Sequence, residues 1–237
     1  MIFLRVAVAW VWTALFWTAA FLLQALCLKR LPRDLIHLAP RFWGRVTFAM
    51  LGIRLEIIGE STLETPGPKV VAFNHQSALD MIWSAAICPP RAMALGKKEI
   101  AFIPFINLAW WALDFRLVDR SNPSKARASL AAVAREITEK GRALMIAPEG
   151  TRSPDGELLP FKRGAFVVAV QAQVPIYPVV ISGAYALLPR RSFLPAQGVI
   201  RLRYLEPIPT AGLTVSGMDS LVERVRGAMA AALAAQR

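Results

Sequence analysis

The chain has 237 residues, 55% of them hydrophobic, which is enough for one sizeable domain with an appendage. Its net charge of +12 suits an anionic membrane surface better than a nucleic acid, because the sequence has no nucleic-acid-binding motif or basic–aromatic repeat. With two histidines and two widely separated cysteines, it offers no ligand set for a metal ion and no disulfide framework.

An uncharged stretch lies near the start of the chain. Residues 6–28 carry no charge, and as a helix at about 1.5 Å per residue they would span about 35 Å, enough to cross a bilayer. The run is long and leads into no cleavage site or disulfide-rich domain, which disfavours a signal peptide. One arginine precedes the stretch and a larger positive cluster follows it. The positive-inside rule then predicts a cell-membrane protein (inner membrane if bacterial) with its globular part on the cytoplasmic side.

Residues 34–51 have a mixed character that predicts an amphipathic helix at the membrane interface. Pro40 either kinks this helix or marks its true start, and His37 is expected to be an interfacial residue without a catalytic role. We therefore predict that residues 1–53 form a membrane-associated helical hairpin. Whether it spans the bilayer or dips into one leaflet stays open at this point.

Strand and helix patterns alternate through residues 54–237. Seven short runs predict strands at 54–59, 69–73, 92–96, 115–118, 144–147, 176–181 and 200–205, and the run at 69–73 is apolar and β-branched. A helix is expected from Pro123 to Gly141, and Ser216–Asp219 resembles a capping box that opens a C-terminal helix. The alternation predicts an α/β fold, an αβα sandwich over a largely parallel central sheet.

A base and an acid follow the strand at 69–73. His75 is expected in the turn after the strand and Asp80 in the first turn of the next helix, where the imidazole can fold back onto the carboxylate. Asp80 would then fix the histidine tautomer. Two other interpretations remain: Asp80 is only a helix cap, or Ser77 is a nucleophile. For Ser77, a role as N-cap is favoured because no nucleophile elbow surrounds it.

A second polar turn follows the strand at 144–147. Ligands of α/β folds bind at the carboxyl edge of the sheet, where Glu149, Gly150, Thr151 and Arg152 are expected to lie. The glycine allows close backbone approach, the threonine adds a hydroxyl and the guanidinium matches phosphate oxygens. Glu149 could hold a substrate hydroxyl or orient Arg152. A surface turn with a Glu–Arg pair is the alternative.

Four ordered blocks give the chain a specific resemblance to the glycerophospholipid acyltransferase family, in particular its 1-acyl-glycerol-3-phosphate acyltransferases. The blocks are Asn74-His75-Gln76-Ser77…Asp80, Gly96-Lys97-Lys98-Glu99 through to Val118-Asp119-Arg120, Pro148-Glu149-Gly150-Thr151-Arg152-Ser153 and Val174-Pro175-Ile176-Tyr177-Pro178-Val179. The match covers residues 54–208. Ala147 and Asn107 depart from the residues usual in the family, Phe and Gly respectively.

The resemblance implies direct acyl transfer from an acyl thioester to the free sn-2 hydroxyl of a lysophospholipid, giving phosphatidic acid. His75 would be the general base, oriented by Asp80. Substrate binding would fall to Glu149, Gly150, Thr151 and Arg152, with Arg120 and Lys97 as further phosphate ligands. The co-substrate would be acyl-CoA or acyl carrier protein. No metal and no cofactor are expected.

Two rival functions remain open from the sequence. The same chemistry could use another lyso-lipid acceptor, such as a lyso-aminolipid. Alternatively, the chain could be a non-catalytic membrane scaffold, although retaining both His75 and Asp80 argues against a disused site.

Overall fold

The structure, a computed structural model, describes residues 2–27, 30–31, 36–65, 67–118 and 123–236. The strands are β1 (Ile53–Ile58), β2 (Lys69–Phe73), β3 (Ala92–Lys97), β4 (Arg116–Val118), β5 (Ala143–Ile146), β6 (Ile176–Ser182) and β7 (Gly198–Tyr204). The α-helices are α1 (Ile2–Leu26), α3 (Leu38–Leu51), α4 (Asp80–Ala86), α5 (Ile106–Ala112), α6 (Pro123–Lys140), α7 (Gly164–Ala172), α8 (Ala184–Leu187) and α9 (Met218–Ala234), with two 3₁₀ turns, η1 (Lys98–Phe102) and η2 (Val215–Gly217). Each predicted strand is present, with ends that move by one or two residues.

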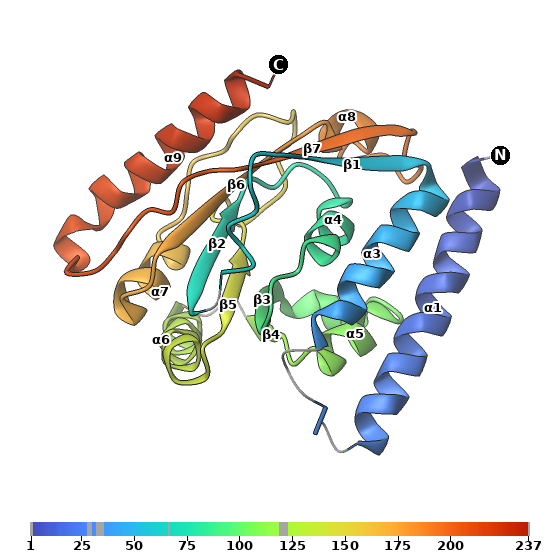
Figure 1. Cartoon of the computed structure of the whole chain (residues 1–237), viewed down its shortest axis with the longest axis horizontal. Coiled ribbons are helices and arrows are strands. Elements are labelled where there is room, and N and C mark those ends of the chain that lie inside the picture. Colours follow the sequence, from blue (N-terminus) through green and yellow to red (C-terminus); the bar gives the residue numbers. More distant parts are fainter. Residues whose placement is uncertain (1, 28–29, 32–35, 66, 119–122, 237) are drawn as a thin grey trace.

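The strands form one mixed sheet in the order β1-β7-β6-β2-β5-β3-β4. Neighbouring strands are parallel except for β6 and β7, which are antiparallel. Helices α6, α7 and α9 cover one face, and α3 and α4 pack on the other (Figure 1). Within β2, Val70 and Ala72 belong to the first core and Val71 to the second, and all three are fully buried. A strand buried on both faces needs a continuous apolar run, which explains its sequence. The predicted sandwich with a largely parallel sheet is confirmed.

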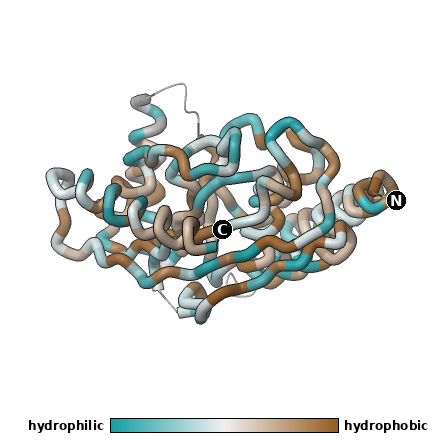
Figure 2. Tube along the Cα trace, turned by 90° about the horizontal axis from the view of Figure 1, so that it is seen from above, coloured by the Kyte–Doolittle hydropathy of each residue, from teal (hydrophilic) through white to brown (hydrophobic). Residues whose placement is uncertain are grey.

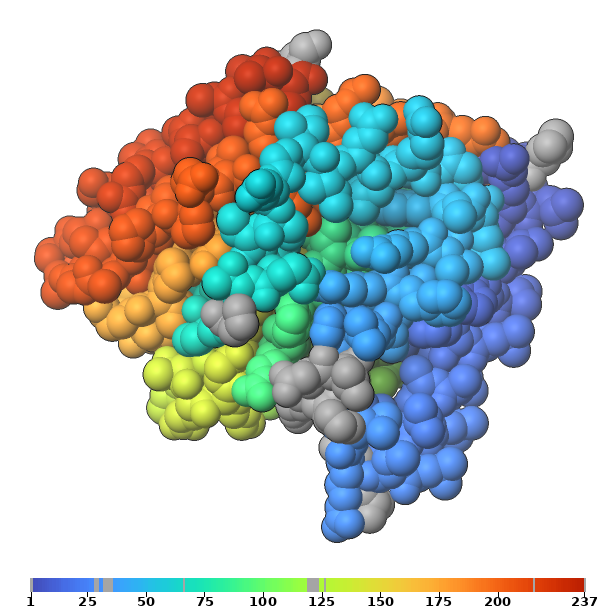
Figure 3. Space-filling view, viewed as in Figure 1, coloured from blue at the N-terminus to red at the C-terminus, as the bar shows by residue number. Residues whose placement is uncertain are grey.

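The first two long helices, α1 and α3, form an antiparallel hairpin at one end of the molecule (Figure 1). Trp43 anchors the pair: its indole nitrogen donates to the Thr13 hydroxyl over 3.2 Å, and its ring lies 5.6 Å from that of Trp17. The space-filling view shows α1 forming one outer edge of the molecule (Figure 3), and the view from above shows the N-terminus at one end of the long axis and the C-terminus about halfway along it (Figure 2). Within the part of the chain that the structure describes, α1 is the one helix long and apolar enough to cross a membrane.

The outer side of α1 is covered with exposed hydrophobic side chains: Phe3, Leu4, Val8, Trp10, Val11, Leu15, Leu22, Leu23 and Leu26. Helix α3 instead packs its buried face on the domain and crosses α4 at close range. A Cβ added at Gly44 would lie 2.7 Å from the Ala86 nitrogen and 2.7 Å from the Ile82 oxygen. Only glycine allows this backbone contact. The hairpin is therefore packed directly against α4, the helix that begins with Asp80.

One of the two predicted helix caps is wrong. Just ahead of α4, the Ser77 hydroxyl accepts the Leu79 N–H over 3.2 Å and Asp80 accepts the Ser77 N–H over 2.9 Å, the two bonds of the predicted capping box, and the hydroxyl also donates to the Leu188 carbonyl over 2.8 Å. Helix α9 begins without a side-chain cap, and the Ser216 hydroxyl bonds to that of Thr214. Pro40 lies in the first turn of α3, so of its two predicted roles it marks the start of that helix.

Candidate active site

The turns that carry His75 and Glu149 meet at one edge of the sheet because the strands before them are parallel neighbours. β2 and β5 pair in register, with Ala72 opposite Ile146. Both chains leave the sheet at its carboxyl edge, so residues a few positions further on must lie close together. The Ser153 N–H donates to the His75 carbonyl over 2.8 Å, and the His75 N–H donates to a Glu149 carboxylate oxygen over 2.7 Å. The two predicted segments therefore form one site.

His75 and Asp80 form a hydrogen-bonded pair. The imidazole Nδ1 lies 2.7 Å from Oδ2 of Asp80, and the histidine side chain is 30% exposed whereas that of the aspartate is 2% exposed. With Nδ1 facing a carboxylate acceptor, Nδ1 carries the proton and Nε2 carries the lone pair. The arrangement can accept a proton at Nε2 and stabilise the resulting imidazolium.

Asp80 is held by three further donors. Its Oδ2 atom also accepts the Gln76 N–H over 2.7 Å and the Ser77 N–H over 2.9 Å. Its other oxygen accepts the indole N–H of the fully buried Trp83 over 2.8 Å. These bonds fix the Asp80 carboxyl group in position beside the His75 imidazole.

Glu149 connects the backbone of the two turns. One oxygen accepts the His75 N–H over 2.7 Å, and the other accepts the Leu159 N–H over 3.1 Å. The side chain is 2% exposed. Burial raises the pKa of the Glu149 carboxyl to about 7, although both backbone bonds act in the opposite direction. The Glu149 carboxyl group thus bonds to backbone N–H groups and not to Arg152. Through these bonds it holds the loop of residues 149–153 against the turn that carries His75.

The Glu149 carboxyl is expected to make the protein less stable as the pH rises. The folded protein holds this proton up to about pH 7, whereas the unfolded chain releases it near 4.5. Stability should therefore fall between these values and level off above them, by on the order of 3 kcal/mol from this group. Thermal unfolding in detergent, compared between the wild type and Glu149→Gln across this range, measures the effect. A difference between the two proteins that does not change with pH would contradict it.

The loop after Glu149 presents backbone and cationic groups. Gly150 has a φ of 72°, a conformation that favours glycine. A Cβ there would lie 3.2 Å from the Lys162 ammonium nitrogen, and the Lys162 N–H donates to the Pro148 carbonyl over 2.8 Å. Thr151 and Arg152 are half-buried beside it. Among the residues that the structure describes, neither Arg152 nor Lys162 forms an ion pair.

Two predicted phosphate ligands remain, Lys97 and Arg120, and the structure describes one of them. Lys97 is the last residue of β3, exposed at the same carboxyl edge, since β3 is the parallel neighbour of β5. Arg120 lies outside the described residues. No group of His, Cys, Asp and Glu side chains within the described ranges could hold a metal ion.

Sequence reasoning missed two residues that shape the site. The Asn74 side chain accepts the Ile181 N–H over 2.7 Å and donates to the Ile181 carbonyl over 2.9 Å, which extends the pairing of β2 with β6 beyond its end. The Gln76 amide donates to the Gly156 carbonyl over 2.9 Å, a third bond between the two turns. Polar residues directly beside His75 could have been suspected from the sequence of shaping the site. Their hydrogen-bond partners could not, because these depend on the order of the strands in the sheet.

Comparisons with known proteins show which family the chain belongs to. The model of the acyltransferase family matches residues 54–182. A human protein named 1-acyl-sn-glycerol-3-phosphate acyltransferase alpha is 36% identical over 76% of this chain and 64% of its own length. A Saccharomyces cerevisiae protein named 1-acyl-sn-glycerol-3-phosphate acyltransferase is 35% identical over 80% of this chain and 63% of its own length. The chain thus spans just under two thirds of these two curated relatives.

A solved structure shares the fold. The 1-acyl-sn-glycerophosphate acyltransferase of Thermotoga maritima superposes with a TM-score of 0.78, covering 100% of this chain and 98% of the other, at 23% sequence identity. The matched family region includes β1 to β6 and thus both turns of the site. The chain belongs to the acyltransferase family.

Proposed function

We propose that this protein transfers a fatty acyl group from an acyl thioester to the sn-2 hydroxyl of 1-acyl-glycerol-3-phosphate, giving phosphatidic acid. The observation that carries the proposal is the pair of backbone bonds between the His75 turn and the loop of Glu149–Ser153. They hold a proton acceptor next to a loop suited to a phosphate. The names of the human and yeast relatives support this acceptor.

The chemistry needs one base. His75 Nε2 removes the proton of the acceptor hydroxyl as the oxygen attacks the thioester carbonyl. A carbon–oxygen bond forms, the carbon–sulfur bond breaks, and the thiolate leaves with the proton that His75 returns. Asp80 holds the imidazole through Nδ1, 2.7 Å away, and stabilises the imidazolium while it exists. No covalent enzyme intermediate is needed.

The acceptor phosphate is proposed to bind the loop at Gly150 and Thr151, with Arg152 as its main cation. A guanidinium without an acidic partner in the described part of the chain is available for a bidentate bond to phosphate oxygens. Lys97 and Arg120 are proposed as further ligands. Glu149, with both oxygens bonded to backbone, is proposed to position the loop and His75.

The donor is proposed to be acyl-CoA or acyl carrier protein, each a thioester co-substrate. Membrane association through the hairpin, with the domain on the cytoplasmic side, suits a reaction of this kind. A lysophospholipid that stays in the bilayer avoids exposing its chain to water, at about 0.8 kcal/mol per methylene. The exposed hydrophobic side of α1 supports this placement.

Replacing Arg152 with alanine is expected to lower kcat/KM for lysophosphatidic acid by roughly 10- to 100-fold, the value of a lost hydrogen bond to a charged group. Purified protein is given acyl-CoA or acyl carrier protein with each acceptor, and thiol release is measured. A lyso-aminolipid without phosphate serves as the second acceptor. Arg224→Ala, an exposed arginine on α9, is the matched control and should behave as wild type.

The outcomes separate the rival functions. Equal activity on both acceptors, unchanged by Arg152→Ala, would favour another lyso-lipid as the substrate. No thiol release with either donor would favour a non-catalytic membrane scaffold.

A further inference from the structure

The connection from α8 to β7, residues 188–197, carries an unusual surface and is called the Phe193 loop below. Phe193 is 91% exposed, the largest value among the exposed large hydrophobic residues that the structure describes. Arg190 and Arg191 are exposed beside it. A single exposed hydrophobic side chain is ordinary on a soluble protein, so its meaning depends on its surroundings.

The Phe193 loop is closed at its base. The Ala196 N–H donates to the Leu187 carbonyl over 2.7 Å, and within the loop the Ser192 N–H donates to the Pro189 carbonyl over 2.9 Å. Pro195 is buried. Since the two ends are bonded together and one proline is packed inside, the tip that carries Phe193 is directed outward from a fixed base.

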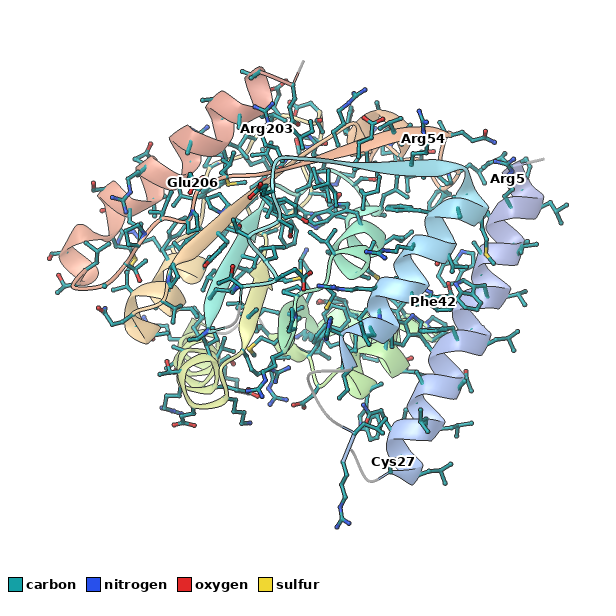
Figure 4. All side chains as sticks on the ribbon, in the orientation of Figure 1. Arg5, Cys27, Phe42, Arg54, Arg203 and Glu206 are labelled. Atoms are coloured by element: carbon teal, nitrogen blue, oxygen red, sulfur yellow. The ribbon has the colours of Figure 1, made fainter. Side chains whose placement is uncertain are left out.

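The Phe193 loop adjoins the first turn of α1. A Cβ added at Gly52 would collide with both the Arg5 guanidinium and the Gln197 side chain, so these two side chains lie together over Gly52. Figure 4 shows Arg5 at this end of α1, and Figure 1 shows the connection from α8 to β7 at the same end of the molecule. Phe3 and Leu4, next to Arg5, are 71% and 69% exposed. The C-terminal end of the loop therefore adjoins the end of α1 that carries these exposed hydrophobic side chains.

The charged residues of the Phe193 loop are both arginines, Arg190 and Arg191. Further along the chain, Arg201 forms an ion pair with Glu56 of β1 over 3.1 Å and adds no net charge. Aromatic side chains with flanking arginines are typical of the membrane–water interface, and each cation near an anionic surface adds about a fivefold gain in binding. We propose that the Phe193 loop is a second membrane contact, separate from the hairpin, and that its partner is an anionic lipid bilayer.

The proposed contact has a direct connection to the catalytic turn. The Ser77 hydroxyl donates to the Leu188 carbonyl, the first residue of the loop, over 2.8 Å, and the Ser77 N–H donates to Asp80. A loop docked on lipid is therefore joined at its base to the turn that carries His75, and we expect the bilayer surface to lie on that side of the molecule. This consequence rests on the proposed function: it lets a lysophospholipid reach the base while its acyl chain stays in the membrane.

A fluorescent probe at the loop tip tests the contact without using activity. Phe193→Cys is made in full-length protein with Cys27→Ser and labelled with an environment-sensitive dye. The remaining Cys88 is buried, and burial raises the pKa of its thiol to about 12, so it will not react. Ser220→Cys, exposed on α9, which covers the face of the sheet opposite to α3 and α4, is the matched control.

The labelled proteins are reconstituted into vesicles of phosphatidylcholine with or without phosphatidylglycerol. We expect a blue-shifted emission and strong quenching by brominated lipid at position 193, greater with phosphatidylglycerol, and water-like emission at position 220. Water-like emission at both positions overturns the proposal. Because this readout needs no catalysis, it stands or falls separately from the acyltransferase reaction.

A second variant gives a kinetic readout. Phe193→Ser should raise the KM for acceptor presented in anionic vesicles by about tenfold, the equivalent of partly burying one phenylalanine. The KM for detergent-dispersed acceptor should not change. The alternative partner of the loop is a second copy of the chain, which light scattering in detergent tests by measuring the molar mass. If Phe193→Ser turns an oligomer into a monomer, the loop is an interface between copies of the chain and the lipid proposal is wrong.

Discussion

Replacing His75 with alanine is expected to lower acyl transfer by roughly 10²- to 10⁴-fold, the usual contribution of a general base. The imidazole offers the lone pair of Nε2 at this edge of the sheet, because Nδ1 is bonded to Asp80 over 2.7 Å. Alanine removes Nε2 and leaves the backbone bonds of residue 75 in place, so the two turns should stay together. The rate is measured as thiol release with lysophosphatidic acid at saturating donor.

The chain offers a matched control in its other histidine. His37 lies just before α3, at the hairpin, and His37→Ala should keep the wild-type rate. Circular dichroism and the thermal midpoint of His75→Ala should match the wild type, since the side chain is 30% exposed and buries little hydrophobic area. A near-normal rate in His75→Ala would remove it from the mechanism.

The prediction of the His75–Asp80 pair from sequence succeeded because it depends on local geometry. A strand that ends at Phe73 and a helix that begins at Asp80 leave a turn of fixed length, in which the two side chains must face each other. Strand identity was equally local: β2 and β5 are continuous apolar runs that only a doubly covered sheet can bury.

The contacts that sequence could not predict depend on strand order. Glu149 was expected to face a hydroxyl or Arg152, but its oxygens accept N–H groups at positions 75 and 159. Both donors come close only because β2 and β5 are neighbours and the loop after β5 folds back on itself. The same holds for the bond that the Ser77 hydroxyl donates to the Leu188 carbonyl, 111 residues away. The Ser77 oxygen still accepts the local Leu79 N–H, so the near bond was predictable from sequence and the distant one was not.

Replacing Asp80 with asparagine is expected to lower the rate by about 10²- to 10⁴-fold and to destabilise the fold as well. Oδ2 accepts three N–H groups, so the asparagine oxygen must take that position. Its amide then points at the Trp83 indole N–H, donor against donor, where the wild type has a bond of 2.8 Å. Leaving a buried donor unpaired costs roughly 1–3 kcal/mol.

A double-mutant cycle with Trp83→Phe separates the two effects. Phenylalanine has no N–H group, so in that background Asp80→Asn no longer leaves an unpaired donor at position 83 and should cost less stability. The activity should not recover, because the imidazolium still lacks its carboxylate partner. Thermal unfolding and thiol release are measured on all four proteins of the cycle. If the double variant regained the rate of Trp83→Phe along with its stability, Asp80 would serve only the fold. If the double variant regains stability but not rate, Asp80 is the residue that orients His75 and stabilises its imidazolium.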